Sequence, residues 1–236
     1  MTPSFLRKLI LKITNKDQWE TYFSFSLLNS TFKSLYSVGK VFEDKDIHTR
    51  QNHIRNYLIN QYKREKILFI EFGVMRGAFT NLVSETNNNK NSRIIGFDSF
   101  EGLNQPWAGN QIGAFSTNGE IPKTTDPRVS YVKGWFQNTV KANLEKLSFS
   151  NYDQVIVSFD ADLYSSTLYC LIELNDVLDS YIAIFDEFAP DECRALYDYI
   201  MPYGASVEFK ARSGSKELPN KVICKIKNCK TGQYTI

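Results

Sequence analysis

The chain has 236 residues, of which 42% are hydrophobic and 23% charged, an ordinary balance for a globular protein long enough to form one well-packed α/β domain. Twenty-eight basic residues against 26 acidic residues give a formal charge of +2, which is too balanced to predict a nucleic-acid-binding face. No apolar run approaches the ~20 residues that a membrane-spanning helix needs, so no transmembrane segment is expected.

The N-terminal stretch 5–13 is short, basic and amphipathic. Charges break its apolar run and no small-residue cleavage site follows, so a signal peptide is not expected. We expect a helix that packs on the core or on a partner subunit, which makes a homo-oligomer through the N-terminal helices possible. Contact with an anionic membrane surface is the alternative interpretation.

Residues 1–66 are predicted to form a helical extension, with Ile54, Tyr57 and Leu58 at helical spacing. Residues 67–236 are predicted to form the main domain, because short apolar runs typical of buried parallel strands alternate there with helical patterns. The predicted strands cover 67–70, 93–97, 129–132, 154–159, 181–185, 205–211 and 222–226. The predicted helices cover 79–85, 138–147, 166–179 and 192–201.

This alternation indicates right-handed βαβ units on a mostly parallel, seven-stranded sheet of the Rossmann-like α/β class. The last two strands are joined by the polar segment 213–220 and are expected to form an antiparallel hairpin at one edge. In such sheets ligands bind beyond the carboxyl ends of the strands. The residues that end the strands are therefore the candidates for a functional site.

The first strand-to-helix turn carries Gly73 and Gly77, and the second strand ends at Asp98. A glycine lets a ligand approach the backbone closely, and a carboxylate at the second strand tip can accept ribose hydroxyls. The loop lacks the tighter G-x-G-x-x-G that a pyrophosphate prefers, so S-adenosylmethionine suits it better than a dinucleotide. A plain tight turn and a helix cap at Asp98 are the competing interpretations.

Gly134, Trp135 and Phe136 follow the third strand and are candidates to flank the adenine, with core packing as the equal alternative for the two aromatic residues. Trp107 and Phe115 lie in the long connection 101–127, which is of the length that lids and substrate walls have.

Acidic residues end the fourth and fifth strands: Asp160 and Asp162 on one, Asp186 and Glu187 on the other. Carboxylates crowded in one cleft repel one another unless a cation or protons compensate them, and Mg²⁺ suits such hard oxygen ligands. We predict that Asp160, Asp186 and Glu187 bind Mg²⁺ and that Asp162 is the general base for a hydroxyl acceptor. Helix capping explains one or two of these acids but not all of them.

Four motifs, taken together, resemble the macrocin/mycinamicin-type sugar O-methyltransferases. They are Glu-Phe-Gly-Val-x-Arg-Gly at 71–77, Gly-Phe-Asp-Ser-Phe-Glu-Gly-Leu at 96–103, Asp-x-Asp-Leu-Tyr-x-Ser-Thr at 160–167 and Asp-Glu at 186–187. The resemblance covers about 66–195. It implies a class I methyltransferase fold, S-adenosylmethionine, Mg²⁺ on Asp160 and the 186–187 pair, and a sugar hydroxyl as acceptor. It also favours Asp162 as the base.

On this resemblance the cofactor is expected to contact Glu71, Gly73, Val74, Gly77, Thr80, Asp98, Ser99, Gly134, Trp135, Phe136 and Asp160. Asp160 is expected to take part in catalysis as well. The chain departs from the pattern at Glu187, where Asp or Asn is commoner, and the connection 101–127 has no histidine. Glu187 therefore differs from the ligand type of the family, and no role of a loop histidine can transfer.

Four cysteines, at 170, 193, 224 and 229, include no C-x-x-C pair, and the chain has only two histidines. A Cys/His zinc site and a disulfide framework are therefore not expected, and Cys170 lies in an apolar helical pattern as a buried thiol does. This cysteine usage fits a reducing cytoplasm.

Two other functions use the same fold. A nicotinamide-dependent oxidoreductase would need a glycine fingerprint and, in short-chain enzymes, a late Tyr-x-x-x-Lys; the pattern at Tyr62 and Lys66 precedes the first predicted core strand. A non-catalytic nucleoside-binding module would have no need of acids at both halves of the cleft. The favoured acceptor is the hydroxyl of a small molecule or glycan, and no nucleic-acid partner is expected.

Overall fold

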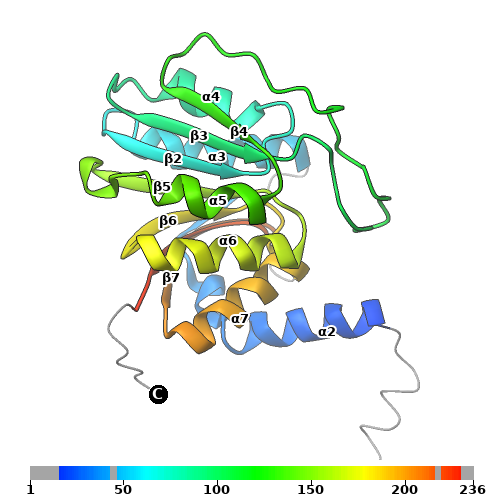
Figure 1. The fold of residues 1–236 in the computed structure, drawn as a ribbon. Coiled ribbons are helices and arrows are strands. Elements are labelled where there is room, and N and C mark those ends of the chain that lie inside the picture. Colours follow the sequence, from blue (N-terminus) through cyan, green and yellow to red (C-terminus); the bar gives the residue numbers. More distant parts are fainter. Residues whose placement is uncertain (1–15, 43–46, 216–218, 230–236) are drawn as a thin grey trace, which may run out of the picture.

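The computed structural model describes residues 16–42, 47–215 and 219–229 (Figure 1). The amphipathic stretch 5–13 lies outside these residues. The strands form one mixed sheet in the order β1-β7-β8-β6-β5-β2-β3-β4. Their bounds are β1 Lys40–Phe42, β2 Ile67–Phe72, β3 Arg93–Asp98, β4 Val129–Lys133, β5 Gln154–Phe159, β6 Ser180–Phe185, β7 Ser206–Gly214 and β8 Pro219–Lys227.

The helices cover both faces of this sheet. Figure 1 shows α5, α6 and α7 on one face, with α2 beside α7, and α3 and α4 on the other. Their bounds are α2 Lys16–Asn29, α3 Ile47–Gln61, α4 Ala78–Thr86, α5 Phe136–Leu144, α6 Tyr164–Val177 and α7 Cys193–Tyr203, with short helical turns η1 Lys33–Ser37, η2 Phe149–Asn151 and η3 Phe188–Glu192. In the described part of the chain no helix is long and apolar enough to cross a membrane.

The central strands are buried on both faces, which explains their continuous apolar runs. Every residue of β2 is buried, and β5 and β6 are buried except at their first residue. Strands β2 to β6 run parallel, whereas β8 pairs antiparallel with both β6 and β7. The predicted Rossmann-like architecture with a C-terminal antiparallel hairpin is confirmed, and Cys170 is buried on α6 as expected.

The predicted number of strands was wrong, because the described part of the chain forms eight rather than seven. The additional strand, β1, lies in the region predicted to be a helical extension and pairs parallel with β7. It has three residues, which is too short for alternation of apolar and polar side chains to reveal it.

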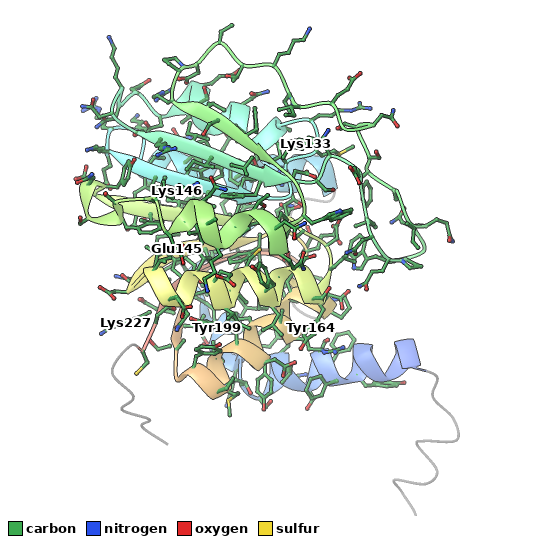
Figure 2. The ribbon with its side chains drawn as sticks, viewed as in Figure 1. Lys133, Glu145, Lys146, Tyr164, Tyr199 and Lys227 are labelled. Carbon is green, nitrogen blue, oxygen red and sulfur yellow. The ribbon has the colours of Figure 1, made fainter. Side chains whose placement is uncertain are left out.

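The chain order changes direction between β2 and β5. Strand β2 pairs with β3 on one side and with β5 on the other, so the units β2-α4-β3 and β5-α6-β6 extend from this point in opposite directions. Open α/β sheets bind their ligands beyond the carboxyl ends of the strands at such a switch point. In Figure 2 this end of the sheet carries the labelled Lys133 and Tyr164, whereas Glu145, Lys146 and Lys227 lie towards the other end.

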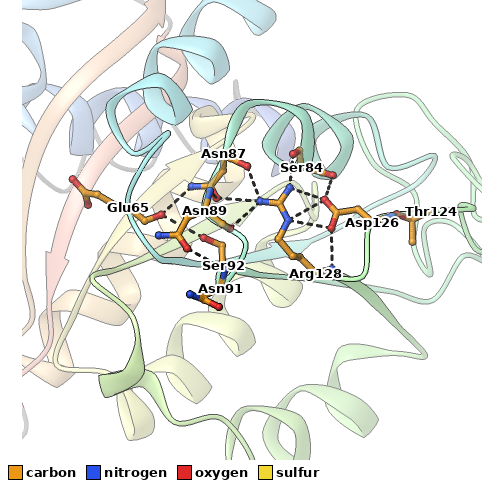
Figure 3. Close-up of polar contacts among 9 residues, drawn as sticks. All are labelled: Glu65, Ser84, Asn87, Asn89, Asn91, Ser92, Thr124, Asp126 and Arg128. Carbon is orange, nitrogen blue, oxygen red and sulfur yellow. Dashed lines mark hydrogen bonds and ion pairs between the residues drawn. The ribbon is translucent and has the colours of Figure 1, made fainter.

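The opposite end of the sheet is fastened by a group that we call the Arg128 cluster: Ser84, Asn87, Asn89, Asp126 and Arg128 (Figure 3). The guanidinium of Arg128 donates to both carboxylate oxygens of Asp126 and to three backbone carbonyls, at Ser84, Asn87 and Asn89. These carbonyls lie at or just beyond the C-terminal end of α4, where helix carbonyls have no partner within the helix. The cluster therefore joins the end of α4 to the start of β4.

Candidate active site

A pocket of about 260 Å³ lies at the switch point, beyond the carboxyl ends of the parallel strands. The turns after β2, β3, β4, β5 and β6 all contribute to its lining. Most of the residues predicted to contact the cofactor line this pocket: Gly73, Val74, Asp98, Ser99, Gly134, Trp135, Phe136 and Asp160. The structure thus brings together in one cavity residues that lie almost ninety positions apart at the extremes, from 73 to 160.

Three of the predicted cofactor residues do not line the pocket. Glu71 and Thr80 are buried, and the Thr80 hydroxyl donates to the Glu71 carboxylate. Burial raises the pKa of Glu71 to about 8, although the hydrogen bond from Thr80 opposes the shift. Gly77 sits at the start of α4 in a left-handed conformation with φ of 76°. These residues support the first turn from outside the cavity, and their contact with a cofactor stays a prediction.

Gly73 is required by the backbone geometry at the switch point. Its φ is +92°, and a Cβ atom built there would lie 1.8 Å from the carbonyl oxygen of Asp160. A side chain at this position would therefore overlap the turn after β5. The absence of one lets the turn after β2 lie directly against that turn and places both at the pocket.

Asp98 ties the turns after β2 and β3 together. Its Oδ2 accepts hydrogen bonds from the backbone N–H groups of Val74 and Met75, both at 2.7 Å, and its Oδ1 accepts one from Phe100 at 2.7 Å. Asp98 therefore does stabilise the turns, which was the alternative interpretation to ribose binding. This role does not use up the carboxylate, because the two oxygens together offer about four acceptor positions and these contacts fill three.

The acids after β5 and β6 divide into two layers. Asp160, Asp162 and Glu187 line the pocket. Asp186 is not among the lining residues and is only 6% exposed. Its carboxylate contacts two buried cations: Arg55 Nη2 at 2.5 Å from Oδ1, and the ammonium of Lys221.

Arg55 also contacts Asp160, with Nη2 at 2.8 Å from Oδ2. The guanidinium therefore bridges one carboxylate in the pocket wall and one behind it. Burial and the neighbouring Asp186 raise the pKa of the Asp160 carboxyl. Burial would also raise the pKa of Asp186, but Lys221 and Arg55 outweigh it and lower that pKa below its ordinary value.

Asp162 has the properties expected of a general base. Its backbone adopts a left-handed conformation, with φ of 59°, which is uncommon outside glycine and is often found at functional sites. Burial, followed by the charges of Asp160 and Glu187, raises the pKa of Asp162 to about 8. A carboxyl with a pKa close to neutral is well matched to accept a proton from a substrate.

The predicted metal ligands do not fit a Mg²⁺ site. Arg55 and Lys221 already contact one oxygen of each carboxylate, Oδ2 of Asp160 and Oδ1 of Asp186. Among residues 16–42, 47–215 and 219–229, no three His, Cys, Asp or Glu side chains form a group that could hold a metal ion. A divalent cation at Asp186 would lie beside two positive groups, and the repulsion at such distances is large in a buried site.

Sequence reasoning missed Arg55, Lys221 and Glu192. Glu192 is fully buried behind the pocket, where its Oε2 accepts the backbone N–H of Glu187 at 3.0 Å. Its Oε1 has no hydrogen-bond partner within the described part of the chain, and burial raises the pKa of Glu192 well above its ordinary value. A signal existed for Arg55: it lies four residues before the buried Ile59 on α3, and so on the same face of that helix.

The connection 101–127 forms part of the pocket wall through Leu103, Trp107 and Phe115. The indole Nε1–H of Trp107 donates to Asp191 Oδ2 at 2.8 Å. Asp191 belongs to η3, which follows the acids after β6. The connection is therefore joined to the segment after β6; Figure 1 shows it as the long segment between β3 and β4.

The strand order settles the fold. The chain has a Rossmann-like α/β fold. No protein-family model and no curated protein matches it. Among solved structures, the O-methyltransferase NovP is 19% identical over 74% of this chain and 78% of that chain, with a TM-score of 0.49.

Two further structures are similar at the same level. CalS11, a TDP-rhamnose 3'-O-methyltransferase of calicheamicin biosynthesis, is 18% identical over 89% of this chain and 95% of that chain, with a TM-score of 0.47. An O-methyltransferase from Bacillus cereus, in complex with SAH, is 11% identical over 86% and 90%, with a TM-score of 0.47. These likenesses concern the fold, and the function is argued from the pocket.

Proposed function

We propose that this protein transfers a methyl group from S-adenosylmethionine to a hydroxyl oxygen of a sugar-containing acceptor. The observation that carries the proposal is the convergence of most of the predicted nucleoside-contacting residues, together with Asp162, on one pocket. A pocket for a nucleoside without phosphates needs a close backbone approach, an acid and aromatic surface. Gly73, Asp98 and the pair Trp135–Phe136 supply these at its wall.

The proposed step is a direct displacement. The Asp162 carboxylate takes the proton of the acceptor hydroxyl, and the oxygen attacks the methyl carbon of the cofactor. The carbon–sulfur bond breaks, and S-adenosylhomocysteine leaves with the electron pair of that bond on sulfur. Holding acceptor and cofactor in line supplies in advance the entropy that the encounter of two free molecules would cost.

The acceptor is proposed from other residues that line the same pocket. Trp107 and Phe115 present aromatic surface there, and Asn104, Gln137 and Ser166 add hydrogen-bonding groups. Aromatic surface beside polar groups suits a sugar ring, which has apolar C–H faces and hydroxyl edges. This arrangement agrees with the motif resemblance to sugar O-methyltransferases.

No step is assigned to Mg²⁺, because buried cations already contact the predicted ligands Asp160 and Asp186. Ligation by Glu187, a homo-oligomer through the N-terminal helices and action in the cytoplasm stay predictions. The division at residue 66 also stays a prediction, although β1 and Arg55, from before that boundary, contribute to the sheet and to the acid cluster.

Calorimetric titration with S-adenosylmethionine tests the cofactor. We expect saturable one-to-one binding, weakened at least ~10-fold in Asp98→Ala, because the lost carboxylate would accept hydrogen bonds from ribose hydroxyls and also stabilises the turns. Asp176→Ala, at an exposed position on α6, is the matched control and should bind as the unmodified protein does. Unchanged tight binding in Asp98→Ala would reject the assignment of that carboxylate.

Parallel titration with NADH separates the methyltransferase from an oxidoreductase, since the loop lacks the glycine fingerprint of dinucleotide sites. Incubation with labelled S-adenosylmethionine and glycan extracts, followed by mass analysis, then tests for transfer and identifies the acceptor. Binding of NADH in place of S-adenosylmethionine would overturn the proposal. Cofactor binding with no transfer to any hydroxyl compound would leave a nucleoside-binding module as the function.

A further inference from the structure

Two cations from opposite ends of the chain meet at the acid cluster. Arg55 comes from α3, before the first central strand, and Lys221 comes from β8, the last strand. The side chain of Arg55 is 11% exposed, and that of Lys221 is fully buried. Burial of such groups is costly unless each charge has an opposite charge and hydrogen bonds. Their presence together beside Asp160 and Asp186 therefore requires an explanation.

The contacts balance charge at the oxygen atoms themselves. Oδ1 of Asp186 contacts both the guanidinium of Arg55 and the ammonium of Lys221, and Oδ2 of Asp160 contacts the guanidinium. Two cations thus face two carboxylates in direct contact. For Asp160 and Asp186, the compensation that crowded acids need comes from the chain's own side chains rather than from a divalent ion.

Both cations are also held by their surroundings. The ammonium of Lys221 donates to the backbone carbonyl of Asp186 at 3.1 Å. The guanidinium of Arg55 lies over the ring of Phe79, with its central carbon 4.7 Å from the ring centroid. A metal entering this position would have to displace at least one buried cation from its partners, and an unpaired buried charge is strongly unfavourable.

We propose that Arg55 and Lys221 are positioning residues that take the place of a divalent cation. They hold the carboxylate of Asp160 in the pocket wall and that of Asp186 behind it, and the protein binds no Mg²⁺ at these acids. For catalysis, the inference rests on the proposed methyltransferase function. It then predicts that methyl transfer proceeds without a divalent metal. Asp162 then takes the hydroxyl proton with no metal-bound oxygen involved.

Metal titration of the full-length protein, without cofactor or acceptor, tests the inference. Electron paramagnetic resonance measures the binding of Mn²⁺, and calorimetry measures the binding of Mg²⁺. We expect no saturable binding by the unmodified protein up to ~1 mM metal, well above the range of many dedicated sites for hard cations. Arg55→Met removes one positive charge and frees oxygens on both acids, so we expect it to gain Mn²⁺ affinity by at least ~10-fold.

Arg93→Met is the matched control, because Arg93 is exposed and starts β3 at the far end of the sheet. It should bind no more metal than the unmodified protein. One-to-one Mn²⁺ binding by the unmodified protein that Asp186→Asn abolishes would overturn the inference. Folded Arg55→Met protein with no gain in affinity would overturn the role given to Arg55. If Arg55→Met does not fold, the titration of the unmodified protein decides alone.

A second readout separates this inference from the proposed function. Methyl transfer by the unmodified protein should persist in excess chelator, and Arg55→Lys should retain more of the activity than Arg55→Met because it keeps the charge. Loss of transfer in chelator, with recovery on adding Mg²⁺, would overturn the inference while supporting the proposed function. Failure to bind S-adenosylmethionine would instead overturn the proposed function and leave the metal titration unaffected.

Discussion

Two arginines of similar burial lie at opposite ends of the sheet, and they are used differently. The side chain of Arg128 is 15% exposed and that of Arg55 is 11% exposed. Arg128 shares its donors between one carboxylate and three fixed backbone carbonyls (Figure 3). Arg55 directs a single nitrogen, Nη2, at two carboxylates, and its buried Nε has no hydrogen-bond partner within the described residues.

The surroundings of the two arginines distinguish a charge that stabilises the fold from a charge at a candidate functional site. Around Arg128 the backbone carbonyls left over at a helix end are satisfied, which is what a stable fold requires. Around Arg55 several acids crowd together, and one buried donor remains without a partner. The crowding of acids is the distinguishing feature, because the buried Nε of Arg212 also has no hydrogen-bond partner within the described residues.

The largest expected effect is on turnover, from a substitution in the pocket. Asp162→Asn should lower kcat by about 10²–10⁴-fold, the usual contribution of a positioned general base, with little change in affinity for S-adenosylmethionine. Steady-state kinetics and calorimetry measure the two quantities separately. Asp176→Asn serves as the exposed control on α6. Weakened cofactor binding with intact turnover would remove Asp162 as the base.

At the other end of the sheet we expect a loss of stability instead. Arg128→Met should lower the free energy of unfolding by about 2–3 kcal/mol, because it removes the cation paired with Asp126 and leaves three carbonyls without their guanidinium donor. Urea denaturation measures the change, with Arg93→Met as the exposed control. Cofactor affinity of the folded variant should not change. Equal losses of stability and affinity would show that the two ends are coupled.

The pH dependence of kcat/KM sharpens the role of Asp162. Its pKa is raised to about 8, and the base must be deprotonated, so activity should increase ~10-fold per pH unit below that value and level off above it. Initial rates at subsaturating acceptor, from about pH 6 to 9, measure the profile, with folding monitored by circular dichroism. A flat or falling profile over this range would contradict the assignment.

The smallest effect concerns Asp126 in the Arg128 cluster. Its hydrogen bonds with Arg128, chiefly, lower its pKa below the ordinary value, so the folded state favours the carboxylate. The stability that it contributes is present above about pH 4, the pKa of an unfolded Asp, and is lost as pH falls towards the lowered folded value. The difference in free energy of unfolding between the unmodified protein and Asp126→Asn should therefore be about 1 kcal/mol smaller at low pH than near neutrality. Urea denaturation at both pH values measures it. A difference independent of pH would contradict this.

The central strands and their ends could be predicted from the sequence because they obey local rules. The run Ile67–Phe72 is apolar throughout since both faces of β2 are covered, and Gly73 follows where the backbone must turn against another strand end. Once the strands are known to be parallel, the residues at their ends must meet. The pocket lining at Asp98, Gly134 and Asp160 follows from that rule alone.

The charge partners could not be predicted in the same way. Arg55 and Asp160 are 105 positions apart, and Lys221 and Asp186 are 35 apart, so their contacts depend on how α3 and the C-terminal hairpin pack on the sheet. Crowded carboxylates call for positive charge, but the sequence pattern does not reveal whether side chains or a metal supply it. For this reason the sequence predicted Mg²⁺ at Asp160 and Asp186, where the structure has the side chains of Arg55 and Lys221.

The short strand β1 has a consequence for the protein's behaviour at high concentration. Unpaired strand edges are templates on which other chains can aggregate. Strand β7 has nine residues and lies next to the margin of the sheet, where β1 pairs with Ala211, Arg212 and Ser213. A three-residue outer strand that begins with the exposed Lys40 offers few backbone groups and a positive charge to an approaching chain. Along residues 211–213 of β7, the sheet is thereby protected against strand addition.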